Sequence, residues 1–301
     1  MMDLSRVVVL ANGKGGVGKT SLVGNLAGEF ARAGVRVLVV DLDPQANLRQ
    51  DFGAIEHPAD DDGDSIFEAA MGQKPLTVVK GLREGLDWIP GGQRLNWLVQ
   101  LAPLKQAGGI EAAWRSALAH VIDEGGYDLV LVDTPPSNRA LQLMALAAAR
   151  WIVVPIGSDL ASIVGVEVLG PLVGTTKRDL NPDLDWLGMV LFRHLSTATR
   201  VRQTVLDDLA ARDLAIPLLE TSIRASESTA QACRRKGLLV HEVVSSSPTA
   251  QERLTALRAR RTDPSVVVPD SSSSTAVALA EDYAALANEI TQFIQAAEAA
   301  A

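Results

Sequence analysis

One stretch of eight residues constrains the fold of this chain more than any other. Residues 14–21 read KGGVGKTS; they follow an apolar run at 7–11 and precede a helical pattern at 22–32. A strand, a glycine-rich turn and a helix N-terminus in this order form a phosphate cradle, because glycines let backbone N–H groups converge on phosphate oxygens. The sequence therefore predicts a nucleotide phosphate loop. Its expected members are Gly15, Gly16, Val17, Gly18, Lys19, Thr20 and Ser21.

Three side chains in this stretch are of chemical interest. The ammonium group of Lys19 supplies a positive charge for the β- and γ-phosphates, and the Thr20 hydroxyl is positioned to bind Mg²⁺. Lys14 is not required by the phosphate-loop pattern. A lysine beside such a loop is more often a solvated surface charge, but a cation facing a transferring phosphoryl group would stabilise the charge that develops there. The rest of the chain has to decide between these two interpretations.

Acidic residues follow two further buried strand patterns. The run at 35–40 ends in the string DLDPQ, with Asp41 and Asp43, and the run at 127–132 ends in DTPP, with Asp133. In doubly wound folds the carboxyl ends of parallel strands lie beside the phosphate loop. A carboxylate at such a strand end can hold Mg²⁺ through water. We therefore expect Asp133 to belong to a metal site.

The three motifs together resemble those of the ParA/MinD ATPases, which carry a deviant Walker A loop. The strings that match are KGGVGKT, DLDPQ and YDLVLVDTPP, and the resemblance extends over about residues 7–244. It implies that Lys14 reaches across a dimer interface to the partner's nucleotide, that Asp43 orients the attacking water and that Asp41 supports the Mg²⁺ site. The implied cofactors are ATP and Mg²⁺, and the implied activity is ATP hydrolysis.

Strand patterns alternate with helix patterns through most of the chain. This alternation predicts an α/β fold: a doubly wound, mostly parallel sheet with helices on both faces, as in P-loop NTPases. We expect residues 1–244 to form the nucleotide-binding ATPase domain and residues 245–275 a polar linker rich in Ser and Arg. Residues 276–301 are expected to form an amphipathic helix docked on the domain. A short helix is expected at 76–82.

Composition limits the class of protein. The single cysteine, Cys233, excludes an intramolecular disulfide and a metal or iron–sulfur site made only of cysteines. No apolar run approaches the ~20 residues of a transmembrane helix, and the N-terminus shows no signal-peptide pattern. The helix pattern at 276–301 contains no Lys or Arg, unlike a basic membrane-binding tail. We therefore expect a cytoplasmic protein that does not bind membranes.

The net charge of −8 argues against a uniformly basic nucleic-acid-binding surface. Contact with DNA would need a local cluster of cations. The candidates, in order of preference, are Arg234, Arg235 and Lys236; then Arg200 with Arg202; then the arginines between 253 and 261. For each cluster, a solvated helix face is an equally good interpretation.

The resemblance leaves four functional hypotheses. The preferred one is a ParA-like, nucleoid-associated ATPase that partitions plasmid, phage or chromosomal DNA. In this model a homodimer forms on ATP binding and binds DNA without sequence preference, and a ParB-like centromere-binding protein stimulates hydrolysis and release. The second hypothesis is a MinD-like membrane-surface regulator, against which the non-basic tail argues. The third is a positioning ATPase for a protein cargo, and the fourth a ligase or synthase of the wider phosphate-loop class.

Overall fold

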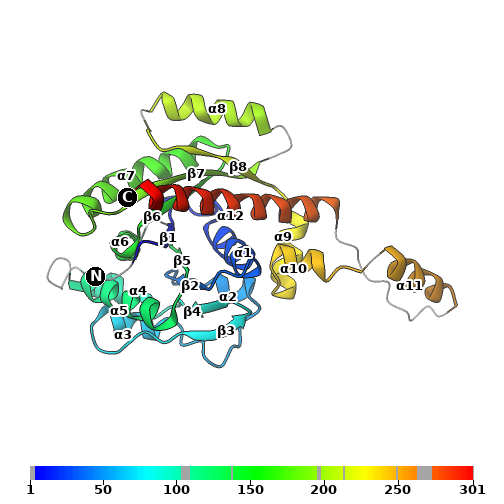
Figure 1. The fold of residues 1–301 in the computed structure, drawn as a ribbon, viewed down its shortest axis with the longest axis horizontal. Coiled ribbons are helices and arrows are strands. Elements are labelled where there is room, and N and C mark those ends of the chain that lie inside the picture. The colour runs from blue at the N-terminus through cyan, green and yellow to red at the C-terminus, as the bar shows by residue number, and fades with distance from the viewer. Residues whose placement is uncertain are drawn as a thin grey trace.

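Helices cover both faces of one sheet, which has eight strands in the described part of the chain (Figure 1). The computed structural model describes residues 4–102, 109–136, 138–194, 198–212, 214–248, 250–262 and 273–300. The strands are β1 Val7–Leu10, β2 Val37–Asp41, β3 Val79–Arg83, β4 Leu86–Ile89, β5 Leu129–Asp133, β6 Trp151–Ile156, β7 Asp185–His194 and β8 Leu218–Arg224. The helices are α1 Lys19–Arg32, α2 Leu48–Asp51, α3 Asp64–Ala70, α4 Leu95–Leu101, α5 Gly109–Gly125, α6 Arg139–Ala148, α7 Leu160–Asp179, α8 Ala198–Ala210, α9 Glu227–Lys236, α10 Val240–Ser245, α11 Ala250–Thr262 and α12 Ser274–Ala300.

The strand order places the phosphate loop at the middle of the sheet. That order is β3-β4-β2-β5-β1-β6-β7-β8, and every pairing is parallel except that of β3 with β4. β1 lies between β5 and β6, so the chain leaves β1 toward one edge and later returns to build the other. In such a sheet, ligands bind outside the carboxyl ends of the strands around this switch point. The predicted doubly wound, mostly parallel fold is confirmed.

Side chains that alternate along the strands divide between two apolar cores. Val7 and Val9 belong to the core under α3 to α7, whereas Val8 and Leu10 belong to the core under α1, α10 and α12. Successive strand residues point to opposite faces, so a strand that is buried on both faces reads as a continuous apolar run. This is why the pattern at 7–11 contains no polar position until the loop begins.

Helix α12 lies across the second face, beside α1 and β8 (Figure 1). Its buried side chains include Leu279, Tyr283 and Ile290. Its carboxylates bind the adjacent edge of the sheet: Asp282 receives two bonds from the Arg224 guanidinium, and Glu289 accepts the backbone N–H groups of residues 220 and 221. The acidic face of α12 is therefore partly used within the chain.

Two segments differ from simple expectations. The helix expected at 76–82 is wrong: residues 79–83 form β3, which pairs with β4 as an antiparallel edge strand. Helix α11 occupies much of the predicted linker and lies apart from the sheet, on the far side of α10 (Figure 1). None of the described helices is long and apolar enough to cross a membrane.

Candidate nucleotide site

The phosphate loop is shaped by one glycine immediately before α1. Gly18 has a φ of 92°, in the left-handed region that favours glycine. A Cβ atom at this position would also lie 2.0 Å from the Phe192 ring at the end of β7. The backbone conformation and the close approach of an aromatic ring therefore each favour glycine at position 18. The remaining glycines of the loop that face the site, Gly15 and Gly16, line the same cavity as Gly18.

Lys19 begins α1 with its side chain held along the loop. It is 6% exposed, and its Nζ donates to the backbone carbonyls of Lys14 at 3.1 Å and Asn12 at 3.4 Å. Burial lowers the pKa of Lys19, while the nearby carboxylates of Asp133 and Asp43 act in the opposite direction. A largely desolvated cation at the amino end of a helix is a strong point of attraction for phosphate.

Three carboxylates meet at the ends of two neighbouring strands. Asp41 and Asp133 end β2 and β5 and are register partners, and Asp43 follows two residues later. The Thr20 hydroxyl donates to Asp133 Oδ2 at 2.6 Å, and the Asp43 backbone N–H donates to Asp41 Oδ1 at 2.9 Å. Burial raises the pKa of Asp133 to about 7, with the charge of Asp43 acting in the same direction. Burial and the facing Asp133 charge raise the pKa of Asp41 well above its usual range.

Two oxygens of this cluster have no hydrogen-bond partner among the described residues. Asp41 Oδ2 and Asp133 Oδ1 are both buried, and both belong to side chains that are fully enclosed. A buried acceptor without a partner carries a desolvation cost that a cation would remove. The described residues contain no group of three or more His, Cys, Asp or Glu placed to hold a metal alone. The donor set therefore fits Mg²⁺, which takes one or two carboxylates and fills its shell with water and phosphate oxygens.

Lys14 is not among the residues that line the cavity, and it pairs with the N-cap residue of α7. Its Nζ lies 2.5 Å from Asp159 Oδ1, and both side chains are substantially exposed. Asp159 is also the N-cap of α7, where its side chain accepts the backbone N–H of Ser162. Lys14 holds the pKa of Asp159 below its ordinary value. The structure thus gives Lys14 a partner within its own chain.

Sequence reasoning missed Asn12, which anchors the loop to the strand beside it. Its side-chain nitrogen donates to the carbonyls of Pro155 and Ser162, and its oxygen accepts the Lys14 backbone N–H. Gly165 fits against this side chain, since a Cβ there would lie 2.1 Å from Asn12 Oδ1. A polar residue that ends a buried strand just before the loop is the signal that could have identified it.

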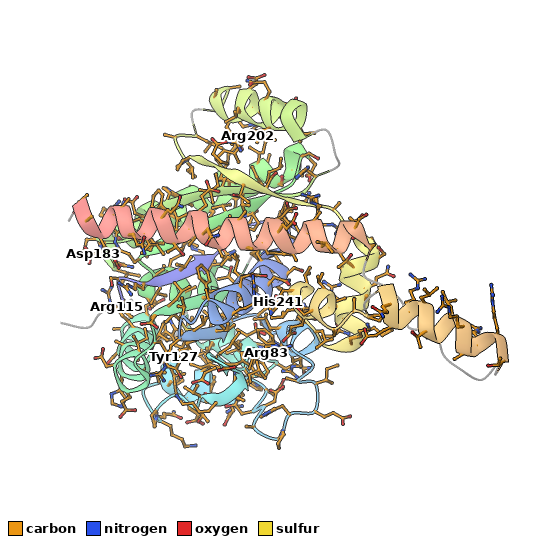
Figure 2. All side chains as sticks on the ribbon, turned by 45° about the vertical axis from the view of Figure 1, so that its right-hand side comes forward. Arg83, Arg115, Tyr127, Asp183, Arg202 and His241 are labelled. Atoms are coloured by element: carbon orange, nitrogen blue, oxygen red, sulfur yellow. The ribbon has the colours of Figure 1, made fainter. Side chains whose placement is uncertain are left out.

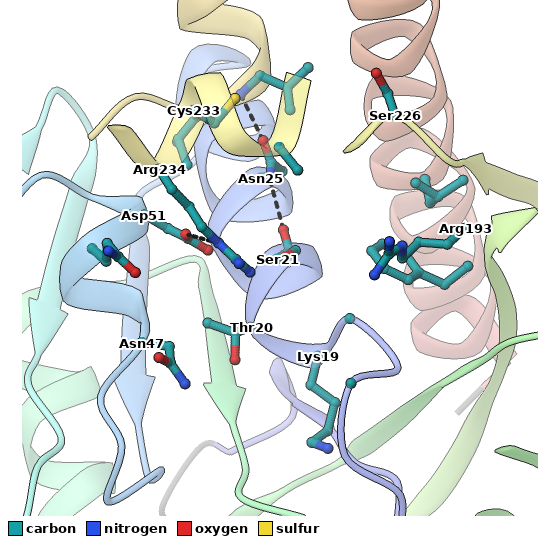
Figure 3. A pocket seen from close by; sticks show the side chains of 18 of the residues that line it. Lys19, Thr20, Ser21, Asn25, Asn47, Asp51, Arg193, Ser226, Cys233 and Arg234 are labelled. Atoms are coloured by element: carbon teal, nitrogen blue, oxygen red, sulfur yellow. Dashed lines mark hydrogen bonds and ion pairs between the residues drawn. The ribbon is translucent and has the colours of Figure 1, made fainter. Parts of the chain in front are cut away.

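The loop opens into a cavity of about 500 Å³. Beyond the loop, its walls come from α2, from the ends of β7 and β8, and from α9 and α12. Residues on these walls that sequence reasoning did not assign include Asp51, Phe192, Arg193, Cys233, Leu279 and Tyr283. They lie far from the loop in sequence, so no local pattern points to them. Figure 3 shows Arg193 and Arg234 on opposite sides of the space above Thr20.

The segment at 224–227 lies at the same cavity, with its charges already paired. Arg224 binds Asp282 of α12, and Glu227 binds Arg193 at 2.7 Å. Arg193 has a φ of 59°, a left-handed conformation that is uncommon for a residue other than glycine. The Arg193–Glu227 pair therefore joins the end of β7 to the start of α9 beside the cavity.

The candidate DNA-binding residues do not form one cluster. Arg202 is bound to Glu220 and to the carbonyls of residues 218 and 219, between α8 and β8 (Figure 2). The side chain of Arg200 lies outside the described part of the chain. Arg234 lines the cavity and pairs with Asp51. Within the described residues, Arg235 and Lys236 are exposed and form no ion pair.

Comparison with known proteins decides the family. A family model described as an AAA domain matches residues 5–186. The chromosome-partitioning ATPase Soj of Thermus thermophilus is 39% identical over 187 residues, which cover 62% of this chain and 68% of that relative. This chain belongs to the ParA/MinD family of ATPases. The resemblance carried by the three motifs is thereby confirmed.

A second sequence relative and one solved structure extend the comparison. The cell division protein PomZ of Myxococcus xanthus is 34% identical over 225 residues, covering 73% of this chain and 67% of that relative. A crystal structure of cobyrinic acid a,c-diamide synthase from Mycobacterium smegmatis, with a bound ATP analogue and magnesium, matches with a TM-score of 0.63 and 28% identity. That match covers 88% of this chain and 99% of the other. ParA/MinD relatives thus carry names from chromosome partitioning and cell division.

Proposed function

We propose that this ParA/MinD-family chain is an ATPase that partitions plasmid, phage or chromosomal DNA. The observation that carries the ATPase part of the proposal is a pair of buried carboxylate oxygens, on Asp41 and Asp133, which have no hydrogen-bond partner among the described residues. They lie beside Thr20 and Lys19, so a metal and a phosphate group would each meet complementary charge. The partitioning role is supported by the similarity to Soj, a chromosome-partitioning ATPase.

ATP and Mg²⁺ are the proposed ligands of the site. Thr20, Asp41 and Asp133 would hold Mg²⁺, and the loop from Gly15 to Ser21 would hold the phosphates. Bound Mg²⁺ supplies positive charge that offsets the charge developing on the phosphoryl oxygens. Lys19 contributes a second positive charge from within the chain. Asp43, which is buried and lines the cavity, orients the attacking water in this proposal.

Lys14 acts in the proposed mechanism from the opposite subunit. Two protomers join across their loops on ATP binding, and each Lys14 leaves Asp159 to face its partner's nucleotide. Because Lys14 is half-exposed and held by a single ion pair near the surface, this exchange costs little. A cation supplied in trans to a phosphoryl group is worth about 10³- to 10⁵-fold in rate.

The proposed DNA contact is the α9–α11 basic surface, defined by Arg235, Lys236, Arg258, Arg260 and Arg261. These side chains are exposed and form no ion pair within the described residues, whereas Arg202 and Arg234 are held by carboxylates. Residues 234–262 contain seven Lys or Arg against two Glu, in a chain whose net charge is −8. Such a surface neutralises phosphates without reading base edges. The contact is therefore non-specific, and a ParB-like partner triggers hydrolysis and release.

A DNA-retention experiment tests this function. The wild-type chain and the Lys19→Ala variant are mixed with a random-sequence duplex in ATP with Mg²⁺, in ADP with Mg²⁺ and without nucleotide. We expect the wild type to retain DNA in ATP only and independently of DNA sequence. We expect the Lys19→Ala variant to lose both nucleotide binding and DNA retention. DNA retention that does not depend on the nucleotide, or no DNA retention under any of the three conditions, would contradict the partitioning role. The proposal also places the protein in the cytoplasm on the nucleoid.

Positioning of a protein cargo is the second candidate. It is favoured by the 34% identity with PomZ, a cell division protein. The nucleotide site would be the same in both cases. Recovery of an ATP-dependent complex with a protein other than a centromere-binding partner would favour this candidate.

A further inference from the structure

Arg234 belongs to the nucleotide cavity, although the sequence groups it with the cations at 235 and 236. It projects from the last turn of α9, and its Nε lies 3.4 Å from Asp51 Oδ1 at the end of α2. Its side chain is 55% exposed, whereas that of Asp51 is 12% exposed. Figure 3 shows Arg234 extending over the first turn of α1, near Ser21 and Asp51. Asp51, Arg234 and Ser21 all line the same cavity as Lys19.

The backbone that carries Arg234 is fixed against α2. Gly237 follows α9 with a φ of 63°, and a Cβ there would lie 2.3 Å from Gly53 Cα. Arg83 ties the same two turns together, since it donates to the carbonyls of Phe52 and Gly237. Two glycines in backbone contact leave no room for α9 to slide. The Arg234 guanidinium can therefore move by rotation of its own side chain while its Cα stays in place.

The surroundings of Arg234 give its guanidinium two competing anions. Asp51 is a buried carboxylate, and burial raises its pKa while Arg234 opposes that rise. The phosphate loop, which lines the same cavity, is suited to receive the phosphates of a nucleotide. Guanidinium groups form paired hydrogen bonds to carboxylates and to phosphates with similar geometry. The ion pair to Asp51 is long, at 3.4 Å, but loss of Arg234 would leave a largely buried carboxylate without this partner, so the bonds to phosphate must offset that cost.

We propose that Arg234 is a phosphate ligand of the bound nucleotide, supplied by α9 and held by Asp51 until the nucleotide binds. This inference rests on the proposed nucleotide binding and gives Arg234 a role different from that of Arg235 and Lys236. When phosphate enters the cavity, the guanidinium exchanges the carboxylate for phosphate oxygens. Asp51 then sets how readily Arg234 is released, and so tunes nucleotide affinity from the back of the cavity.

The test uses opposite shifts in affinity from the two members of the pair. A fluorescent, slowly hydrolysed ATP analogue is titrated with Mg²⁺ into the full-length wild type, Arg234→Gln, Asp51→Asn and the double variant. Loss of a charge-assisted hydrogen bond is expected to weaken binding roughly tenfold in Arg234→Gln. Removal of the competing carboxylate is expected to tighten binding about threefold in Asp51→Asn. The double variant should bind like Arg234→Gln alone.

A matched control separates this role from a general loss of charge. Arg178 is about as exposed as Arg234 and pairs with Asp179 on α7, so Arg178→Gln removes the same charge from an ion pair that does not line the cavity. The affinity of Arg178→Gln for the ATP analogue should equal that of the wild type, and adenosine without phosphates should bind Arg234→Gln and the wild type equally.

Equal ATP affinity in Arg234→Gln and the wild type would overturn the proposal. So would weaker binding in a folded Asp51→Asn variant, with folding checked by thermal melting. If the wild type itself bound no nucleotide, the proposed function would fail instead.

Discussion

Lys14 and Lys19 lie five residues apart and have opposite surroundings. Lys19 is enclosed by loop carbonyls and faces the carboxylates, whereas Lys14 is at the surface in a pair with Asp159. A buried cation interacts with phosphate through a medium of low effective dielectric, so its charge counts for more than that of a solvated one. This difference is consistent with the proposed roles, in which Lys19 serves the nucleotide of its own chain and Lys14 that of a partner chain.

The Asp43→Ala variant separates binding from hydrolysis. Asp43 lines the cavity but is not among the carboxylates with unpartnered oxygens, so its removal should leave ATP affinity within about threefold of the wild type. Loss of a residue that orients the attacking water should lower turnover by roughly 10²-fold or more. Steady-state phosphate release and equilibrium nucleotide binding measure the two effects. Normal turnover in this variant would remove Asp43 from the mechanism.

Asp159 can be changed so that only its ion pair is lost. Asp159→Ser keeps a residue suited to cap α7 but no longer holds Lys14, whereas Asp159→Ala loses both functions. We expect the Ser variant to dimerise in ATP more readily, with stability close to the wild type. The Ala variant should lose about 1 kcal/mol of stability through the missing cap. Analytical ultracentrifugation and thermal unfolding check these outcomes; equal dimerisation of all three proteins would show that the Asp159 pair does not restrain Lys14.

At this scale the loop and the acidic strand ends could be predicted because each is a local pattern. The structure brings Lys19, Thr20 and Asp133, which belong to two such patterns, close together. The pairing of Arg234 with Asp51 joins residues 183 positions apart and depends on how α9 packs on α2. The run of three cations at 234–236 does not indicate which of the three side chains lines the cavity.

Among the secondary-structure elements, α10 is held by one carboxylate at its first turn. Glu242 accepts two hydrogen bonds from Arg83 of β3, at 2.6 and 2.9 Å, and one from the Leu239 backbone N–H at 2.7 Å. Partial burial alone would raise the pKa of Glu242, but these bonds outweigh it and hold the pKa below its ordinary value of 4.5. Arg83 and His241, which also face this region, are visible beside α10 in Figure 2.

The sign of the resulting pH dependence follows from that lowered pKa. A carboxylate with a depressed folded-state pKa adds stability above its unfolded-state pKa and loses it as the pH falls through the folded value. Glu242→Gln should therefore cost about 1–2 kcal/mol at neutral pH, discounted for partial exposure, and this difference should shrink below pH ~4.5. Urea unfolding of both proteins at pH 7 and at low pH measures it. A cost that does not change with pH would indicate lost packing instead of lost charge.

Element type was predictable where the apolar pattern was long. The strands that end at Asp41 and Asp133 are buried throughout, and their sequences leave no alternative. The segment at 79–83 is short, only partly buried and interrupted by glycine, so it carries no clear period. It becomes a strand because β4 offers an edge with which Val79 and Arg83 pair. Tertiary contact decides such segments, and local propensity does not.

Across the whole molecule, charge is distributed unevenly. The net charge of −8 coexists with the basic segment at 234–262, which means that the remainder of the chain is strongly acidic. A polyanion would be attracted to the basic segment and repelled by the net negative charge of the remainder. The sequence alone revealed the cations, but the structure separates those held by carboxylates from those that remain available.

Neutralising three cations of α11 should weaken the proposed DNA contact without touching the nucleotide site. In the Arg258→Gln/Arg260→Gln/Arg261→Gln variant we expect DNA retention in ATP to fall at least tenfold at moderate salt. The slope of log affinity against log salt should become shallower by roughly 2–3, since each phosphate contact contributes about 0.9. Changing Arg202, which is already bound to Glu220, provides the comparison and should have a smaller effect. Unchanged salt dependence in the triple variant would exclude α11 as the contact.

The place of α12 in the fold has a consequence for synthesis. Leu279 and Tyr283 of this helix form part of the wall of a cavity whose floor is laid down by residues 15–21. A nascent chain in which residues 274–300 are still inside the ribosome has its phosphate loop but lacks one side of the pocket. We therefore expect full affinity for the proposed nucleotide only after α12 has been synthesised and has packed against the sheet.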